Sequence, residues 1–218
     1  MNIDHTNLPL DAAQSVLSFA QLGLNAELQS SAAQAGFTVP TPVQAQAIGP
    51  VLNGRDVLAQ AQTGSGKTAA YVLPVLQLLM ATAASRDEAP KKRTTQVLVL
   101  VPTRELATQV SDVLRDLARP LVQSIKVGTL FGGVSINPQM MSLRSGADVV
   151  VATPGRLLDI VDHNALNLGH VQHLVLDEAD RLLDLGFAEE LQSILALLPA
   201  KRQNLLFSAT FEPAVQTL

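Results

Sequence analysis

Between an apolar run at residues 57–61 and a helix-forming segment, the chain reads Ala61-Gln62-Thr63-Gly64-Ser65-Gly66-Lys67-Thr68. Strand, glycine-rich loop and helix in this order form a phosphate cradle, because loop N–H groups and the helix N-terminus both attract anions. In such a loop Lys67 reaches the β- and γ-phosphates and the Thr68 hydroxyl holds Mg²⁺. Ala61 replaces the usual first glycine, and alanine adopts positive φ less easily. The stretch predicts that all eight residues bind nucleotide, with a merely flexible glycine loop as the alternative.

A second motif places carboxylates at the end of another apolar run, at Val175-Leu176-Asp177-Glu178-Ala179-Asp180. Magnesium keeps most of its water, so one or two carboxylates together with substrate phosphates suffice to bind it. We expect Asp177 to hold Mg²⁺ through water and Glu178 to orient or deprotonate the attacking water. With Lys67 they form the predicted catalytic set. The alternative is a solvated acidic turn after a strand.

Composition limits the class of protein. The chain has 218 residues, a length that a single α/β domain can fill, and 47% of them are hydrophobic, enough for one buried core. The formal net charge is −4, so no overall basic field indicates nucleic acid, although a local basic patch is compatible with it.

Several classes of site and location are excluded or disfavoured by the sequence. The absence of cysteine excludes disulfides, thiolate zinc sites and cysteine nucleophiles. The N-terminus lacks the pattern of a signal peptide, and the longest apolar stretch, 71–84, is too short to span a bilayer. We therefore expect a cytoplasmic protein without a membrane partner. No paired metal spacing is found among the four histidines, which we expect to be structural or solvent-facing: His5, His163, His170 and His173.

Short apolar runs alternate with helical patterns along the chain. Strands are predicted at 57–61, 96–101, 126–131, 148–152, 173–177 and 204–207. Helices are predicted at 42–52, 67–83, 104–118, 137–145, 155–162 and 188–197. Continuous apolar strands are typical of burial on both faces, so the pattern predicts an α/β fold with a mostly parallel sheet covered by helices on both faces. Ligands bind at the carboxyl ends of such strands, where the motifs gather.

The ends of the chain are predicted to differ from this core. Residues 1–16 resemble a loosely ordered extension, and 82–95 an exposed loop. The last residues read as the first turns of a helix opened at Pro213, so we expect the natural protein to continue.

Upstream of the glycine-rich loop, Phe19 and the segment 36–44 could bind a base. The amide of Gln44 offers a donor and an acceptor that match the N6 and N7 edge of adenine, and an aromatic ring can stack on the base. The alternative is a Gly-Phe turn before a helix begun by Pro42.

Four further motifs complete an ordered set: Pro102-Thr103-Arg104-Glu105-Leu106-Ala107, Gly132-Gly133, Thr153-Pro154-Gly155-Arg156 and Ser208-Ala209-Thr210. With the two motifs above, this set resembles that of the DEAD-box RNA helicases over residues 18–215. Residues 177–180 give that family its name. The resemblance implies a RecA-like P-loop NTPase domain at 17–218, the first of two. The second domain, which supplies an arginine to the ATP site, is not in the sequence.

The resemblance also implies an ATP-dependent RNA helicase with ATP and Mg²⁺ as cofactors. The region of Phe19, Thr38 and Gln44 looks like the family's adenine-reading segment. By the resemblance, Asp180, Ser208, Ala209 and Thr210 couple hydrolysis to the separation of RNA strands. Sequence-independent contacts with the RNA backbone fall on Pro102, Thr103, Arg104, Glu105, Gly132, Gly133, Thr153, Pro154, Gly155 and Arg156.

Alternatives stay open at this point. Arg104 and Arg156 are ordinary surface arginines if the resemblance does not extend to RNA. A nucleotide-dependent clamp on RNA or on a protein has the same motifs as an unwinding enzyme. A DNA helicase is disfavoured, because the resemblance places histidine more often at the position of Asp180 in DNA-directed relatives.

Overall fold

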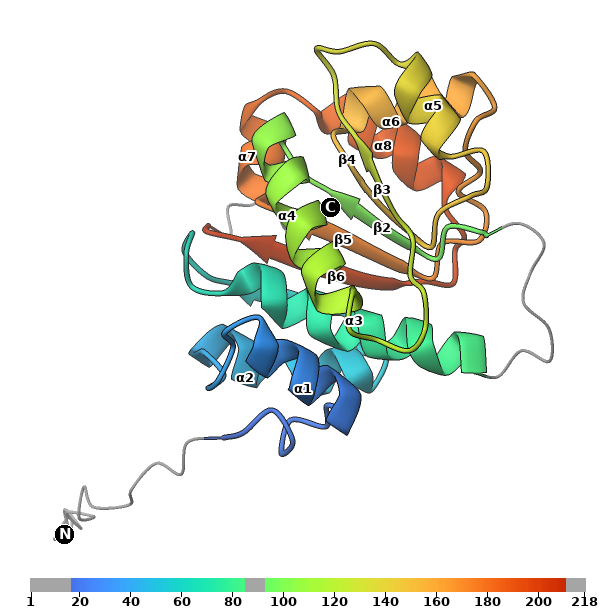
Figure 1. Cartoon of the computed structure of the whole chain (residues 1–218). Coiled ribbons are helices and arrows are strands. Elements are labelled where there is room, and N and C mark those ends of the chain that lie inside the picture. Colours follow the sequence, from blue (N-terminus) through green and yellow to red (C-terminus); the bar gives the residue numbers. More distant parts are fainter. Residues whose placement is uncertain (1–16, 85–92, 211–218) are drawn as a thin grey trace, which may run out of the picture.

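The computed structural model describes residues 17–84 and 93–210. The predicted extension at 1–16, the helix expected from Pro213 and most of the predicted loop at 82–95 lie outside these residues. Figure 1 shows the chain as one α/β unit, in which a twisted sheet lies between two groups of helices.

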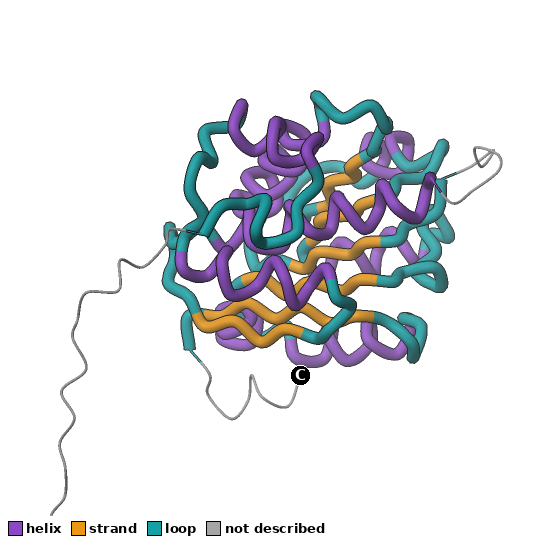
Figure 2. Tube along the Cα trace, turned by 90° about the horizontal axis from the view of Figure 1, so that it is seen from below, coloured by secondary structure: helices purple, strands orange, loops and turns teal. Residues whose placement is uncertain are grey.

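Six parallel strands form the sheet in the order β1-β6-β5-β2-β4-β3. Their bounds are β1 Val57–Gln60, β2 Val97–Leu100, β3 Val127–Leu130, β4 Val149–Ala152, β5 His173–Asp177 and β6 Gln203–Ser208. All six strand predictions are confirmed to within one residue at each end, as is the predicted α/β fold class. Figure 2 shows the strands running side by side within the shell of helices.

Eight helices are found among the described residues. They are α1 Ala26–Gln34, α2 Pro42–Leu52, α3 Lys67–Ala84, α4 Arg104–Ala118, α5 Asn137–Ser142, α6 Pro154–Asp162, α7 Ala179–Asp184 and α8 Ala188–Leu197. The helix predicted at 137–145 is wrong at its end, because the chain leaves α5 in a tight turn closed by Gly146 N–H donating to the Leu143 carbonyl at 2.8 Å.

Two helices were missed by the sequence patterns. In α1 only Leu28, Ser31 and Ala32 are buried, so its apolar stripe is too narrow to stand out. The start of α1 is set by Asn25, whose side chain accepts a hydrogen bond from the Leu28 N–H. Helix α7 has six residues, fewer than two turns, and periodicity cannot detect so short a segment.

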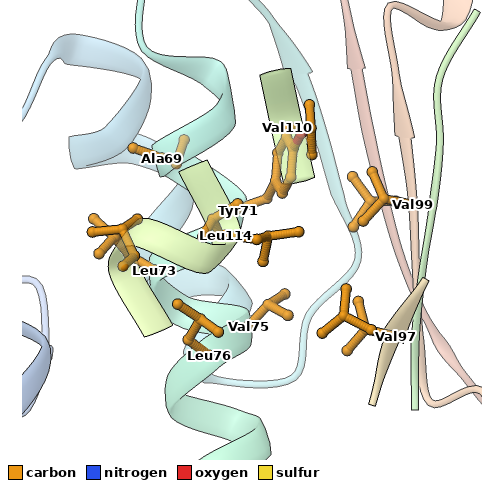
Figure 3. Packing of buried hydrophobic residues seen from close by; sticks show 14 of the residues in the cluster. Ala69, Tyr71, Leu73, Val75, Leu76, Val97, Val99, Val110 and Leu114 are labelled. Atoms are coloured by element: carbon orange, nitrogen blue, oxygen red, sulfur yellow. The ribbon is translucent and has the colours of Figure 1, made fainter. Parts of the chain in front are cut away.

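Alternate residues of the strands feed two separate apolar clusters. Val97, Val99 and Val175 pack against helices α1 to α4 on one face, whereas Leu98 and Leu174 pack against α5 to α8 on the other. In Figure 3, Tyr71 and Val75 of α3 point toward Val97 and Val99 of β2. Burial on both faces explains why these strands are continuously apolar.

Strand β1 is an exception to this pattern. It lies at the edge of the sheet beside β6 only, and its residues alternate between half-buried and exposed positions. Leu58 is 55% exposed. The apolar sequence of β1 does not reveal this edge position, because strand order is not encoded in the strand itself.

No helix among the described residues is both long and apolar enough to cross a lipid bilayer.

Candidate nucleotide and nucleic-acid site

The motifs meet at the end of the sheet where the strands finish, because all the strands run in the same direction. Strands β1, β6 and β5 are neighbours, so residues 61–68, Ser208–Thr210 and Asp177–Asp180 emerge side by side. The Ala61 N–H donates to the Ser208 carbonyl at 3.0 Å, and Gln60 Nε2 donates to the Ala209 carbonyl at 3.1 Å. The predicted convergence of the glycine-rich loop and the acidic motif is therefore found.

Glycine is required at two positions of the loop. Gly64 and Gly66 have φ of +83° and +91°, a region that side chains disfavour. A Cβ on Gly66 would also lie 2.6 Å from Gln44 Nε2. Ala61 is not among the residues with positive φ, so alanine fits the first position of the pattern without strain.

Lys67 is the first residue of α3 and only 6% exposed. Among the described residues its Nζ has no hydrogen-bond partner. A buried ammonium without a partner is costly, and buried charges are normally paired. Lys67 lies at the N-terminus of an 18-residue helix, directly after a glycine loop, and this position favours the binding of an anion. The cradle therefore fits a nucleotide phosphate.

Asp177 ends β5 and is 2% exposed. Its Oδ2 accepts a hydrogen bond of 2.8 Å from the hydroxyl of Tyr71 on α3. Burial raises the pKa of Asp177 above its ordinary value, whereas the Tyr71 hydrogen bond and the Lys67 charge lower it. Burial likewise raises the pKa of the Tyr71 phenol well above its ordinary value, with the Asp177 charge adding to the rise. Tyr71 thus keeps its proton and remains a donor.

Glu178 lies at the turn from β5 into α7 with φ 53° and ψ 53°. A left-handed backbone in a residue other than glycine costs about 1–2 kcal/mol and is concentrated at functional sites. Its side chain is 7% exposed, and Oε2 pairs with Arg181 Nη1 at 2.7 Å. The turn and the ion pair together hold the second carboxylate beside the first.

Asp180 connects the acidic motif to the end of β6. Its Oδ2 accepts the N–H groups of Ala209 and Thr210, each at 3.0 Å, while its own N–H donates to Ser208 Oγ at 3.2 Å. Burial raises its pKa, but hydrogen bonds from Arg181, Thr210, Ser208 and Ala209 outweigh burial, and the net pKa lies below its ordinary value. The expected contact between Asp180 and residues 208–210 is therefore present.

The residues expected to read adenine are placed differently. Phe19 is 6% exposed within the core cluster of α1 to α4, so the structure gives it a packing role. Gln44 is 1% exposed: its Nε2 donates to the Gly66 carbonyl at 3.1 Å and its Oε1 accepts the Thr41 N–H at 3.0 Å. Thr38 is exposed. Gln44 supports the glycine loop in this structure, and adenine contacts by these residues stay a prediction.

A groove of about 620 Å³ runs between α2 and the edge strand β1. It reaches the glycine loop at Ala61 and Ser65, but Lys67 and Asp177 are not among its lining residues. Among the described residues, no cluster of three or more histidines or carboxylates could hold a metal alone. The predicted Mg²⁺ site therefore needs phosphate oxygens beside Thr68 and Asp177.

The remaining motifs follow β2, β4 and β3 and are linked to one another. The Arg104 guanidinium lies 5.2 Å from the centre of the Phe131 ring, and Gln139 bonds both the N–H and the carbonyl of Phe131 at 3.1 Å. Arg156 Nη2 donates to the Val134 carbonyl at 2.9 Å. These contacts hold residues 131–134 against the starts of α4 and α6.

Exposure divides the ten residues expected to contact RNA. Arg104, Glu105, Gly132 and Gly133 are exposed; Thr103, Gly155 and Arg156 are half-buried; Pro102, Thr153 and Pro154 are buried. Thr103 caps α4 by accepting the Leu106 N–H at 3.2 Å. The structure thus brings all three motifs together but presents only part of them to a ligand.

Sequence reasoning missed several residues of these sites. Tyr71 lies in a segment predicted only as a helix, and no role was predicted for Arg181. Phe131 and Gln139 flank the glycine pair at a spacing that no motif marks. Only Arg181 carried a usable signal, because residues three apart on a helix can pair.

Comparison with known proteins identifies the family. A model of the DEAD/DEAH box helicases matches residues 41–218. The ATP-dependent RNA helicase DeaD of Escherichia coli is 44% identical over 201 residues, 92% of this chain and 30% of that protein. The DEAD-box ATP-dependent RNA helicase CshA of Streptococcus pneumoniae is 43% identical, over 93% of this chain and 36% of that protein. The chain therefore spans about a third of the length of these two relatives.

A solved structure agrees with these sequence matches. A DEAD box protein from the hyperthermophile Methanococcus jannaschii superimposes with a TM-score of 0.81 at 35% identity, covering 92% of this chain and 52% of that one. The order of the motifs, the parallel sheet that gathers them and these matches lead to one conclusion: the chain belongs to the DEAD/DEAH box helicase family.

Proposed function

We propose that this chain is the first RecA-like domain, residues 17–218, of an ATP-dependent RNA helicase, and that it binds ATP, Mg²⁺ and the RNA backbone. The observation that carries the proposal is the buried, unpartnered Nζ of Lys67 at the start of α3, beside the buried carboxylate of Asp177. A cation and a metal-binding carboxylate at the end of a glycine loop are suited to a triphosphate. The family of the chain supports the same conclusion.

In the nucleotide site, Lys67 and the loop N–H groups within residues 61–68 that are not already bonded would bind the β- and γ-phosphates; the Ala61 N–H is held by the Ser208 carbonyl. Thr68 and Asp177 would hold Mg²⁺, mostly through water, and the bound metal would supply positive charge beside the phosphates. Glu178 orients the attacking water and accepts its proton. Release of Glu178 from Arg181 would free its carboxylate for this role.

Asp180 and residues 208–210 couple the nucleotide state to RNA. Ser208 ends β6, next to Ala61 of the glycine loop, and Asp180 lies two residues after Glu178. A shift of the carboxylates on hydrolysis therefore acts on a hydrogen-bonded loop rather than on solvent. The coupling is a mechanical one, through the three contacts of Asp180.

RNA would lie over the exposed side of the loops after β2, β4 and β3. The open backbone of Gly132 and Gly133 and the guanidinium of Arg104 suit phosphate oxygens, which carry no sequence information. Gly155, Arg156 and Thr103 line the same region. The buried Pro102, Thr153 and Pro154 act by shaping the starts of α4 and α6.

A second RecA-like domain of the same full-length protein would close the site. In related phosphoryl-transfer systems a completing arginine is worth about 10³–10⁵ in rate. This chain alone should therefore bind nucleotide, hydrolyse ATP very slowly and separate no strands. Robust RNA-stimulated hydrolysis by the chain alone would contradict this division of labour.

The direct test is calorimetric titration of the chain with ADP and with GDP. ADP is expected to bind and GDP to bind much more weakly. Gln44→Ala separates two roles: a loss of ADP affinity alone indicates adenine reading, whereas an equal loss for both nucleotides indicates that Gln44 only supports the Gly66 backbone. No binding of either nucleotide by the wild type would overturn the proposal.

Unwinding must be tested on the full-length protein. A duplex displacement assay with ATP is expected to release a strand. ATP-dependent RNA binding without release would assign the protein to the clamping class instead. We keep a cytoplasmic location as a prediction, which cell fractionation would test.

A further inference from the structure

Tyr71 is a buried polar residue beside the nucleotide site that no motif includes. It lies on α3 one turn after Thr68, is 1% exposed, and is the only tyrosine in the chain. Its hydroxyl donates to Asp177 Oδ2 at 2.8 Å. The Thr68 hydroxyl lies near enough to lower the pKa of the Tyr71 phenol. The phenol thus bonds one of the two residues expected to hold Mg²⁺ and lies one turn along α3 from the other, Thr68.

The ring of Tyr71 is fixed by packing. It contacts the Phe207 ring with centroids 5.2 Å apart and an angle of 54° between planes. Phe207 is 0% exposed and lies opposite Asp177 in the pairing of β6 with β5. Figure 3 shows the side chain within the apolar layer between α3, α4 and β2. A donor held this firmly also fixes the acceptor that it bonds.

We propose that Tyr71 is a positioning residue of the magnesium site, whose hydroxyl sets the orientation of the Asp177 carboxylate relative to Thr68. Partners that hydrogen-bond a metal-binding carboxylate fix its orientation, and their loss typically weakens metal affinity about 10–100-fold. The inference rests on the proposed binding of nucleotide and Mg²⁺. It assigns the hydroxyl a role that phenylalanine, of nearly the same shape, lacks.

A purely structural role predicts a different result from a positioning role. If the hydroxyl only satisfies a buried carboxylate, its removal lowers the stability of the fold and leaves the response to Mg²⁺ unchanged. If it positions Asp177, its removal raises the Mg²⁺ concentration needed for tight nucleotide binding. The metal dependence of binding separates the two roles.

The experiment is a titration of the chain with ADP and with a non-hydrolysable ATP analogue, first in EDTA and then at increasing Mg²⁺. Without Mg²⁺, Tyr71→Phe should bind nucleotide as tightly as the wild type does. With Mg²⁺, the variant should need about ten times the wild-type Mg²⁺ concentration for half-saturation. The matched control is Thr95→Val, which removes another buried hydroxyl, one that donates to the Ala147 carbonyl at 3.1 Å. This control should respond to Mg²⁺ as the wild type does.

The outcomes distinguish the two levels of inference. If the wild type does not bind nucleotide at all, the proposed function and this inference are both overturned. Equal Mg²⁺ dependence in the wild type and in Tyr71→Phe overturns the positioning role alone. A raised Mg²⁺ requirement in Thr95→Val as well would show a general effect of destabilisation and would also overturn it.

A second measurement needs no variant, in case Tyr71→Phe does not fold. Because the chain has one tyrosine and no tryptophan, its intrinsic emission comes from Tyr71. Adding Mg²⁺ to the nucleotide-bound wild type should change this emission beyond the change caused by nucleotide in EDTA. Emission that is the same with and without Mg²⁺ would overturn the proposal.

Discussion

The loops that follow β1, β6 and β5 differ from those that follow β2, β4 and β3 in what they bury. In the first group three charged side chains are inside: Lys67, Asp177 and Glu178 are each less than 8% exposed. Asp177 accepts a hydrogen bond from Tyr71, and Glu178 pairs with Arg181. In the second group Arg104, Glu105 and the glycine backbone are exposed, whereas the Arg156 side chain is only 9% exposed. The carboxyl ends of one sheet therefore carry a buried charged site beside a more open surface.

The difference agrees with the two ligands that we propose. A triphosphate with its metal is compact, and fixed charges in a partly dry site act on it more strongly than charges in water. A nucleic-acid backbone is extended and repeats the same phosphate, so exposed N–H groups and arginines suffice. The following predictions test whether the two groups of loops are as separate as this comparison implies.

Lys67→Ala should have the largest effect. Truncating one partner of a buried charge contact costs about 2–5 kcal/mol of binding, so ADP affinity should fall by about 30-fold or more. The fold should not lose stability, because the variant removes a buried ammonium that has no partner among the described residues. Calorimetry and thermal unfolding measure the two effects. The control is Lys126→Ala. Lys126 directly precedes β3 and so lies at the opposite end of the strands, and its loss should leave ADP affinity unchanged.

Asp180→Asn should have an intermediate effect on stability. The carboxylate accepts the backbone N–H groups of Arg181, Ala209 and Thr210, and hydrogen bonds to charged groups contribute about 1.5–3 kcal/mol each before solvent exposure is considered. Because Asp180 is partly exposed, we expect a loss of about 1 kcal/mol in urea unfolding. ADP affinity should stay near that of the wild type.

The pH dependence of the same variant sharpens this test. The pKa of Asp180 is lowered in the fold, so its contribution is present above the ordinary carboxyl pKa and is lost as the pH falls through the folded value. The difference in unfolding free energy between wild type and Asp180→Asn should therefore shrink in acid. A difference that stays constant down to acidic pH would exclude the charge as its source.

Gly133→Ala and Gly132→Ala form a matched pair in the exposed glycine loop. Gly133 has φ +77°, so alanine there should cost about 1–2 kcal/mol, whereas Gly132 has neither positive φ nor a neighbour within 4 Å of an added Cβ. Urea unfolding should therefore separate the two variants. Both should bind ADP as the wild type does if the two groups of loops are independent. A changed ADP affinity in either variant would show coupling between them.

The smallest effect concerns His173, at the start of β5 and far from both groups. Burial lowers its pKa, and the Gln203 side chain, which bonds Nδ1 at 2.8 Å, opposes this. A histidine whose pKa is lowered by folding stabilises the fold fully when the pH is above its pKa in the unfolded chain. This contribution is lost as the pH falls below that pKa. Unfolding free energy should decline between neutral and mildly acidic pH, and less so in His173→Gln. ADP affinity at neutral pH should not change.

Much of the site was predictable because its residues are contiguous. Lys67 and Thr68 follow two glycines in one loop, and Asp177 and Glu178 are neighbours, so the chemistry shows in a short window. The contact of Asp180 with residues 208–210 was expected only from the resemblance to a family. Tyr71 was not predictable, since its partner lies 106 positions away and its neighbours in sequence are apolar.

The sequence alone determined the six strands, most of the helices with their approximate bounds, and the glycine-rich loop, because these depend on local propensity, apolar periodicity and adjacent residues. Tertiary structure decided the strand order, which leaves the apolar β1 at an edge. It also decided that Phe19 and Gln44 support the core and the glycine loop, and that a tyrosine bonds Asp177. These features depend on which distant segments pack together, and packing of that kind is a property of the whole chain rather than of any window of it.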